Sequence, residues 1–147
     1  MPQWAKILLI VVGVSFIILG IAGYLGAMAL KNGIEHFEEE TRRAQADGEM
    51  FGLTATLEGC AEETVYRVES CEGSKLICGP SSSTFIWACL ESATFDRHFC
   101  AGLPRAGEDD AIMAWAEAAC GKYGQSENEV CSTVLAVVPG FCEIQRR

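Results

Sequence analysis

The segment CGPSSSTFIWACLESATFDRHFC, residues 78–100, carries three cysteines at intervals of eleven residues. Eleven residues make about three turns of an α-helix, so two such cysteines face one way and lie roughly 16 Å apart, too far to bond to each other. We therefore expect helices whose cysteines pair with those of neighbouring helices. The same interval recurs in the full series, which comprises Cys60, Cys71, Cys78, Cys89, Cys100, Cys120, Cys131 and Cys142.

The spacing of these eight cysteines favours disulfides over a metal site. Zinc and iron–sulfur sites use cysteine pairs separated by roughly two to four residues, whereas the closest pair, Cys71 and Cys78, has six residues between its members. There is no Cys-x-x-Cys motif of a redox or haem protein. We predict four disulfides formed in an oxidising compartment, with the pairing left open, and no metal or other cofactor.

An uncharged run of 24 residues, ILLIVVGVSFIILGIAGYLGAMAL at 7–30, lies between Lys6 and Lys31. As a helix of roughly 36 Å it is long enough to cross a hydrocarbon layer of about 30 Å. We expect residues 7–30 to be a transmembrane helix that acts as a retained signal anchor. The alternative is cleavage at Ala27-Met28-Ala29, which resembles a signal-peptidase site and would release residues 30–147 as a secreted protein.

The orientation of this span rests on the cysteines. Its flanking charges do not favour an inside N-terminus, because Lys6 precedes the span whereas Lys31, Arg42 and Arg43 follow it. Eight thiols without metal spacing are, however, out of place in a reducing cytosol. We therefore expect residues 1–6 to be a cytoplasmic tail and the C-terminal part to be periplasmic or extracellular.

Small residues are concentrated in the second half of the span. Pairs of small residues four apart allow another helix to approach backbone to backbone in a membrane. This pattern predicts a helix-packing face for other membrane subunits or for a second copy of the chain, although glycine and alanine are common in membrane helices in any case. The residues of the predicted face are Gly20, Ala22, Gly23, Gly26 and Ala27.

Beyond the span we expect a charged helical stalk at residues 31–52 and one cysteine-rich helical domain at residues 53–147. A thin apolar stripe with helical spacing runs through the stalk, and Asp47-Gly48 with Gly52 predict the loop that ends it. About 100 residues remain for the domain, which is the usual size for a single compact one.

Helical periodicity predicts four helices in this domain. Residues 60–71 form the first, although Val65–Val68 could also be a strand. After Gly79-Pro80 the serines 81–83 predict the N-cap of a second helix. That helix runs to about Ala93, and two alternatives are open beyond it: the helix continues through Cys100, or a new helix starts at Thr94 and includes Cys100.

The two later helices have clearer boundaries. Three acidic residues at 108–110 predict a helix start and Gly121 its end. Ser126 and Glu129 form a capping box for the last helix, which should close at Pro139-Gly140.

The predicted fold is all-α, and the sequence also predicts an internal duplication and a set of core side chains. An offset of 42 residues maps the three cysteines of 78–100 onto Cys120, Cys131 and Cys142, which indicates two duplicated helical units. The large side chains expected in the core are Phe85, Trp87, Phe95, Phe99, Trp115, Leu135 and Phe141.

No motif in the sequence indicates a particular reaction. The formal net charge of −9 disfavours nucleic acid, whose binders present a basic face. No nucleophile elbow, zinc-protease motif or phosphate-binding loop is present, so we expect no catalytic residues. The leading hypothesis is a non-enzymatic, single-pass membrane protein that serves as an accessory, scaffold or assembly subunit. The alternatives are a membrane-tethered module for a lipid or other small molecule, and a secreted effector or inhibitor.

Overall fold

The computed structural model describes residues 20, 23–24, 34–72 and 74–146. The chain divides into two compact units, Met1–Glu38 and Glu39–Arg147. In the first unit the described residues, which include Gly20, Gly23 and Tyr24, are helical. The rest of the predicted transmembrane helix at 7–30 lies outside the described residues. No helix within the described ranges is long and apolar enough to cross a membrane.

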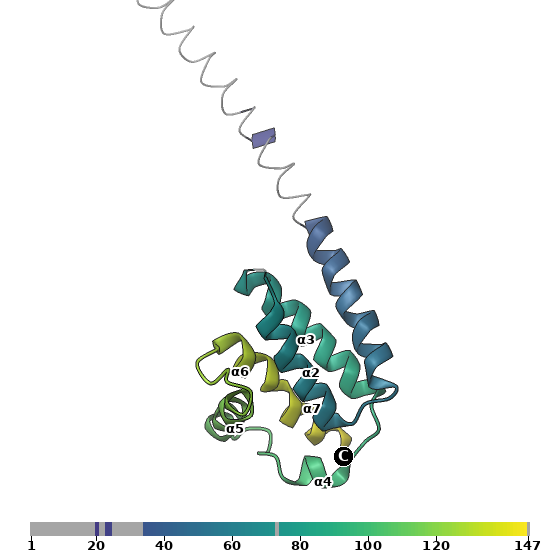
Figure 1. Cartoon of the computed structure of the whole chain (residues 1–147), viewed down its shortest axis with the longest axis vertical. Coiled ribbons are helices and arrows are strands. Elements are labelled where there is room, and N and C mark those ends of the chain that lie inside the picture. Colours follow the sequence, from purple (N-terminus) through teal and green to yellow (C-terminus); the bar gives the residue numbers. More distant parts are fainter. Residues whose placement is uncertain (1–19, 21–22, 25–33, 73, 147) are drawn as a thin grey trace, which may run out of the picture. The chain divides into compact units, whose positions relative to one another are not determined.

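The second unit, which we call the disulfide unit, is helical, as predicted (Figure 1). It carries four disulfides, also as predicted. Its described residues form no strand and make one isolated bridge, between Thr56 and Thr94. The helices are the segment 39–52, α2 (Leu57–Ser70), α3 (Lys75–Ser92), α4 (Arg97–Ala101), α5 (Asp109–Gly121), α6 (Glu129–Leu135) and α7 (Val137–Gln145).

The core forms where α2 and α3 pack side by side (Figure 1), with α6 packed on both of them and α7 packed on α3. The segment 65–68, for which a strand was the alternative, is helical within α2. The inner face of α2 repeats apolar or small residues every three or four positions, so one stripe of the helix is removed from water. That stripe consists of Leu57, Cys60, Ala61, Thr64, Val65 and Val68.

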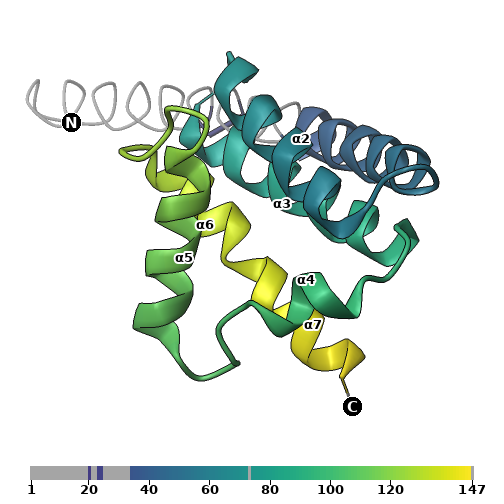
Figure 2. The ribbon, with the colours of Figure 1, turned by 60° about the horizontal axis from the view of Figure 1, so that its bottom comes forward.

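The disulfides join helices in pairs. Cys60–Cys89 joins α2 to α3, and Cys71–Cys78 closes the link between the same two helices. Cys100–Cys142 joins α4 to α7, and Cys120–Cys131 joins α5 to α6, which the ribbon shows side by side in Figure 2. In each pair the two Cα atoms lie between 5.4 and 6.2 Å apart, as a disulfide requires.

The connectivity bears on two predictions from the eleven-residue intervals between cysteines. Cysteines were expected to pair between neighbouring helices, and Cys120 and Cys131 do so, because the chain turns between α5 and α6. The predicted duplication, however, is wrong at the level of structure. Cys78 and Cys89 lie on one continuous helix and bond elsewhere, whereas their proposed counterparts lie on two helices and bond to each other.

Two prolines that were predicted to lie at helix boundaries, Pro80 before a helix and Pro139 at the end of one, lie inside helices. Pro80 is inside α3, which begins at Lys75 and not at the serines 81–83. Gly79 has no Cβ, so part of the clash that keeps a residue before proline out of the α region is absent. The carbonyl of Leu76 loses its helical partner, but this residue is 82% exposed and water can satisfy it. Pro139 lies in the first turn of α7, where proline is tolerated.

The predicted capping box at the last helix is also wrong. Asn128 is the N-cap of α6, and its side-chain oxygen accepts hydrogen bonds from the backbone N–H groups of Val130 (3.1 Å) and Cys131 (3.3 Å). Ser126 lies in the preceding turn. Asparagine caps as well as serine does, so the two candidate positions could not be ranked by residue type alone.

The glycines that were predicted to form a loop are instead helical and pack against α3. Residues 39–52 belong to the disulfide unit, whereas the sequence placed the start of the domain at residue 53. A Cβ on Gly48 would lie 2.4 Å from the carbonyl oxygen of Phe85, and one on Gly52 would lie 2.5 Å from that of Cys89. Glycine is therefore required here for close helix approach and not for a turn.

Three of the seven predicted core side chains are buried, namely Phe85, Leu135 and Phe141. Phe99 and Trp115 are partly buried against the same core. The other two predicted members were wrong, since Trp87 and Phe95 are 37% and 40% exposed. Trp87 still packs edge to face on Phe141, with ring centroids 5.8 Å apart.

We predict that Gly48→Ala lowers the free energy of unfolding by about 1 to 3 kcal/mol, because the new methyl group must push α3 away. The measurement is denaturant unfolding of the full chain in detergent, followed by tryptophan fluorescence. Gly140→Ala is the control, since Gly140 is helical and a Cβ there meets no atom within 4 Å. It should raise stability by up to about 1 kcal/mol. Equal effects of the two substitutions would contradict the close packing.

Candidate functional site

The eight predicted disulfide residues all serve as cross-links, and none is a free thiol. Seven of them are buried, and Cys71 is half-buried. A thiolate nucleophile or metal ligand would need a reduced cysteine. The cysteines therefore account for the rigidity of the disulfide unit and leave its surface to carry any binding function.

The predicted helix-packing face lies in the first unit. Gly20 and Gly23 are helical and exposed, and a Cβ on either would meet no atom within 4 Å. Ala22, Gly26 and Ala27 lie outside the described residues. The packing face stays a prediction.

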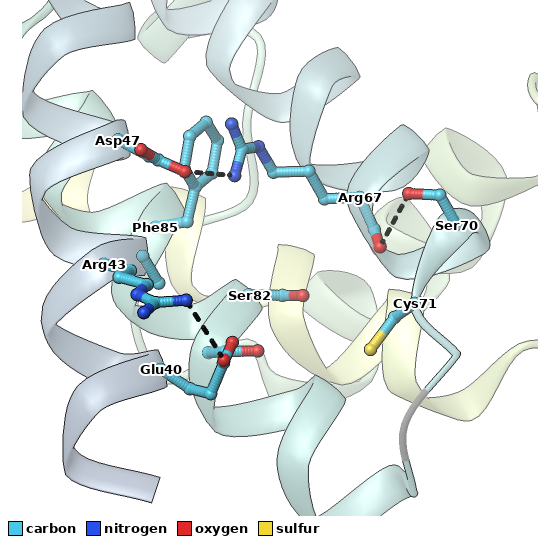
Figure 3. Close-up of a pocket in the computed structure, with 10 residues that line it drawn as sticks. Glu40, Arg43, Asp47, Arg67, Ser70, Cys71, Ser82 and Phe85 are labelled. Carbon is cyan, nitrogen blue, oxygen red and sulfur yellow. Dashed lines mark hydrogen bonds and ion pairs between the residues drawn. The ribbon is translucent and has the colours of Figure 1, made fainter. Parts of the chain in front are cut away.

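A cavity of about 280 Å³ opens between the 39–52 helix, α2 and α3 (Figure 3). Its central side chain is Arg67 of α2, whose guanidinium carbon lies 3.9 Å from the centre of the Phe85 ring. The same guanidinium is paired with Asp47 at 3.2 Å and with Glu63 at 3.1 Å. Arg67 thus links all three helices through one cation.

The Arg67 cavity is better explained as a structural cluster than as a binding site. Arg43, the other cation that lines it, is paired with Glu39 at 3.0 Å and lies 3.9 Å from Glu40. Both cations are already paired with carboxylates, so they would attract an anionic ligand only weakly. A cation over a ring contributes about 0.5 to 2 kcal/mol, so Arg67 stabilises the packing of Phe85.

A second hollow, of about 370 Å³, lies along the outer side of α2, and we call it the α2 groove. It brings together three aromatic rings from separate parts of the chain: Phe51 at the end of the 39–52 helix, Tyr66 on α2, and Tyr123 after α5. All three are at least partly exposed. The full lining of the groove is Phe51, Gly59, Glu62, Glu63, Val65, Tyr66, Glu69 and Tyr123.

The positions of Phe51 and Tyr123 are fixed by packing and by the backbone. The ring of Phe51 lies against that of Phe85, with centroids 6.0 Å apart. Tyr123 lies inside the loop that the Cys120–Cys131 disulfide closes, in a turn that includes Gly124, whose φ of +77° favours glycine. The amide of Gly124 donates to the carbonyl oxygen of Gly121 at 3.1 Å.

The outer face of α2 is acidic. Glu58, Glu62 and Glu69 are exposed, and with Tyr66 they recur at intervals of three or four residues, which places them on one side of the helix. Glu63 differs from them because it is paired with Arg67. Among the described residues, no lysine, arginine or histidine forms an ion pair with Glu58, Glu62 or Glu69.

The pKa of Tyr123 is raised by its contact with this acidic face. Its hydroxyl donates a hydrogen bond of 2.5 Å to Oε1 of Glu62. This bond, together with burial and the charges of Glu62 and Glu58, raises the pKa of Tyr123 to about 12. Loss of the phenol proton would place a third negative charge beside two carboxylates, which explains the direction of the shift.

Sequence reasoning missed the α2 groove. The spacing of Glu58, Glu62, Tyr66 and Glu69 was a usable signal, because it predicts one polar face on the helix that was expected at 60–71. Nothing in the sequence placed Phe51 or Tyr123 beside that face. Both positions depend on how the other helices pack around α2.

We predict that Tyr123→Phe flattens the loss of stability above pH 10. The unfolded chain releases this proton near pH 10 and the folded chain only near 12, so the free energy of unfolding of the wild type falls as pH rises between these values. Brief denaturant titrations at pH 9 and 11 measure this difference. Glu69→Gln, which leaves the bond between Tyr123 and Glu62 in place, should retain the wild-type fall. An identical fall in Tyr123→Phe would contradict the assignment.

The residues on the outer face of α2 match no motif that indicates a particular ligand or reaction. Comparisons of the chain with protein-family models, with curated proteins and with solved structures find no match. The chemistry that the α2 groove offers to a ligand is its own combination of aromatic rings and unpaired carboxylates.

Proposed function

We propose that this chain is a non-enzymatic, single-pass membrane protein in which the disulfide unit, outside the cytoplasm, serves as an accessory or scaffold subunit of a membrane protein complex. The α2 groove is the observation that carries this proposal. It is a hollow on a cross-linked surface that exposes aromatic side chains, the residue type enriched where proteins bind one another.

The proposed location is supported by two features of the chain together. The uncharged run at 7–30 is long enough to span a bilayer as a helix. All eight cysteines follow that run and are oxidised, as in proteins of the periplasm or the cell exterior. A retained anchor would hold the disulfide unit at the membrane surface.

A scaffold role is supported by the rigidity of the disulfide unit. Every helix from α2 to α7 carries or adjoins a disulfide. A surface that is already ordered loses little conformational entropy when a partner binds. The predicted packing face at Gly20, Ala22, Gly23, Gly26 and Ala27 would supply a second contact, with another membrane helix.

The test is to solubilise native membranes in mild detergent and to isolate the full chain with whatever remains bound. We expect a complex larger than the monomer, containing at least one other protein and an uncleaved N-terminus. Gly23→Leu should weaken the complex by blocking helix approach, whereas Val12→Leu, a substitution away from the predicted face, should not. A lone monomer, or a chain that begins after Ala29, would contradict the proposal.

A further inference from the structure

We propose that the α2 groove binds the lysine and arginine side chains of an extended basic segment in a partner polypeptide. The inference rests on the proposed function, in which the disulfide unit binds another protein, and it adds the chemistry of that partner. Tyr66 and Phe51 would contact the cation and its alkyl stem, and Glu62 and Glu69 would pair with its charge.

The aromatic side chains give the groove an affinity for cations. An ammonium or guanidinium group is attracted to the negative face of an aromatic ring, and its apolar stem packs on the same surface. Tyr66 is 64% exposed, so its ring is available to a ligand. The ring of Phe51 packs against that of Phe85 on its inner side, and its outer side lines the α2 groove.

Charge complementarity selects a basic occupant. The carboxylates of Glu58, Glu62 and Glu69 have no cationic partner among the described residues, although the neighbouring Glu63 has one. A hydrogen bond from Tyr123 engages one oxygen of Glu62 and adds no positive charge. The raised pKa of Tyr123 agrees with a negative potential at this position.

The length of the acidic row favours a peptide segment over a small free cation. Glu69 lies eleven positions after Glu58 on α2, so the row covers roughly 16 Å of helix. An extended chain covers this distance with about five residues at roughly 3.3 Å each, so alternate side chains reach the row. The hollow of about 370 Å³ lies within the usual size of ligand pockets.

The probe is a peptide of alternating glycine and arginine, seven residues long with blocked ends, titrated into the full chain in detergent by calorimetry. We expect saturable binding that weakens as NaCl rises from about 0.05 to 0.5 M. The same peptide with glutamate in place of arginine should not bind. Failure of the arginine peptide to bind, or equal binding of the glutamate peptide, would overturn the inference.

Surface variants locate the binding. Tyr66→Ala and Glu69→Gln should each weaken the arginine peptide at least five-fold, and both positions are exposed, so the fold should tolerate the changes. Glu117→Gln removes an exposed carboxylate of α5 instead and should leave binding unchanged. Equal weakening by all three variants would indicate attraction by net charge alone and would also overturn the inference.

Two further outcomes separate the inference from the proposed function. Sedimentation of the peptide-free chain that shows a dimer broken by Tyr66→Ala would mean that a second copy occupies the groove, which overturns the inference. A native complex that survives Tyr66→Ala and Glu69→Gln would overturn it as well, while the proposed function would stand. Absence of any native complex would instead count against the proposed function, even if the peptide binds.

Discussion

Cys60 and Cys89 are fully buried and bonded where α2 meets α3, and the rest of the disulfide unit is arranged around this contact. In the loop-entropy picture a bridge across 29 residues stabilises the fold by about 3 to 4 kcal/mol. It also sets the rotation of α2, because the stripe that contains Cys60 must face inwards. The 39–52 helix then fits against α3 only where Gly48 and Gly52 leave room.

The same constraint creates the α2 groove. Once the inner stripe of α2 is buried, the row of glutamates with Tyr66 must face outwards. The Cys120–Cys131 disulfide holds the turn after α5 so that Tyr123 reaches Glu62, and the packing of Phe51 on Phe85 closes the other side. Structural bonds inside the unit therefore determine which side chains meet on its surface.

Helical periodicity was enough to predict an all-α fold, because it depends on local spacing. The number of cysteines and the absence of metal-ligand spacing were enough to predict four disulfides. The connectivity could not be predicted, because pairing depends on which helices become neighbours. Gly48, Gly52, Pro80 and Pro139 were misread for a related reason. These residue types usually mark helix breaks in an isolated chain. Here the glycines allow close packing, Pro139 lies in the first turn of its helix, and Pro80 leaves the carbonyl of an exposed residue to water.

The most direct test of this account is the disulfide map of the full chain, obtained by proteolysis without reduction and mass spectrometry of the linked peptides. The account predicts the pairs Cys60–Cys89, Cys71–Cys78, Cys100–Cys142 and Cys120–Cys131. Eight cysteines allow many other pairings, so agreement would be informative. A different partner for Cys60, or free thiols that react without reductant, would contradict the arrangement of α2 on α3 and with it the groove.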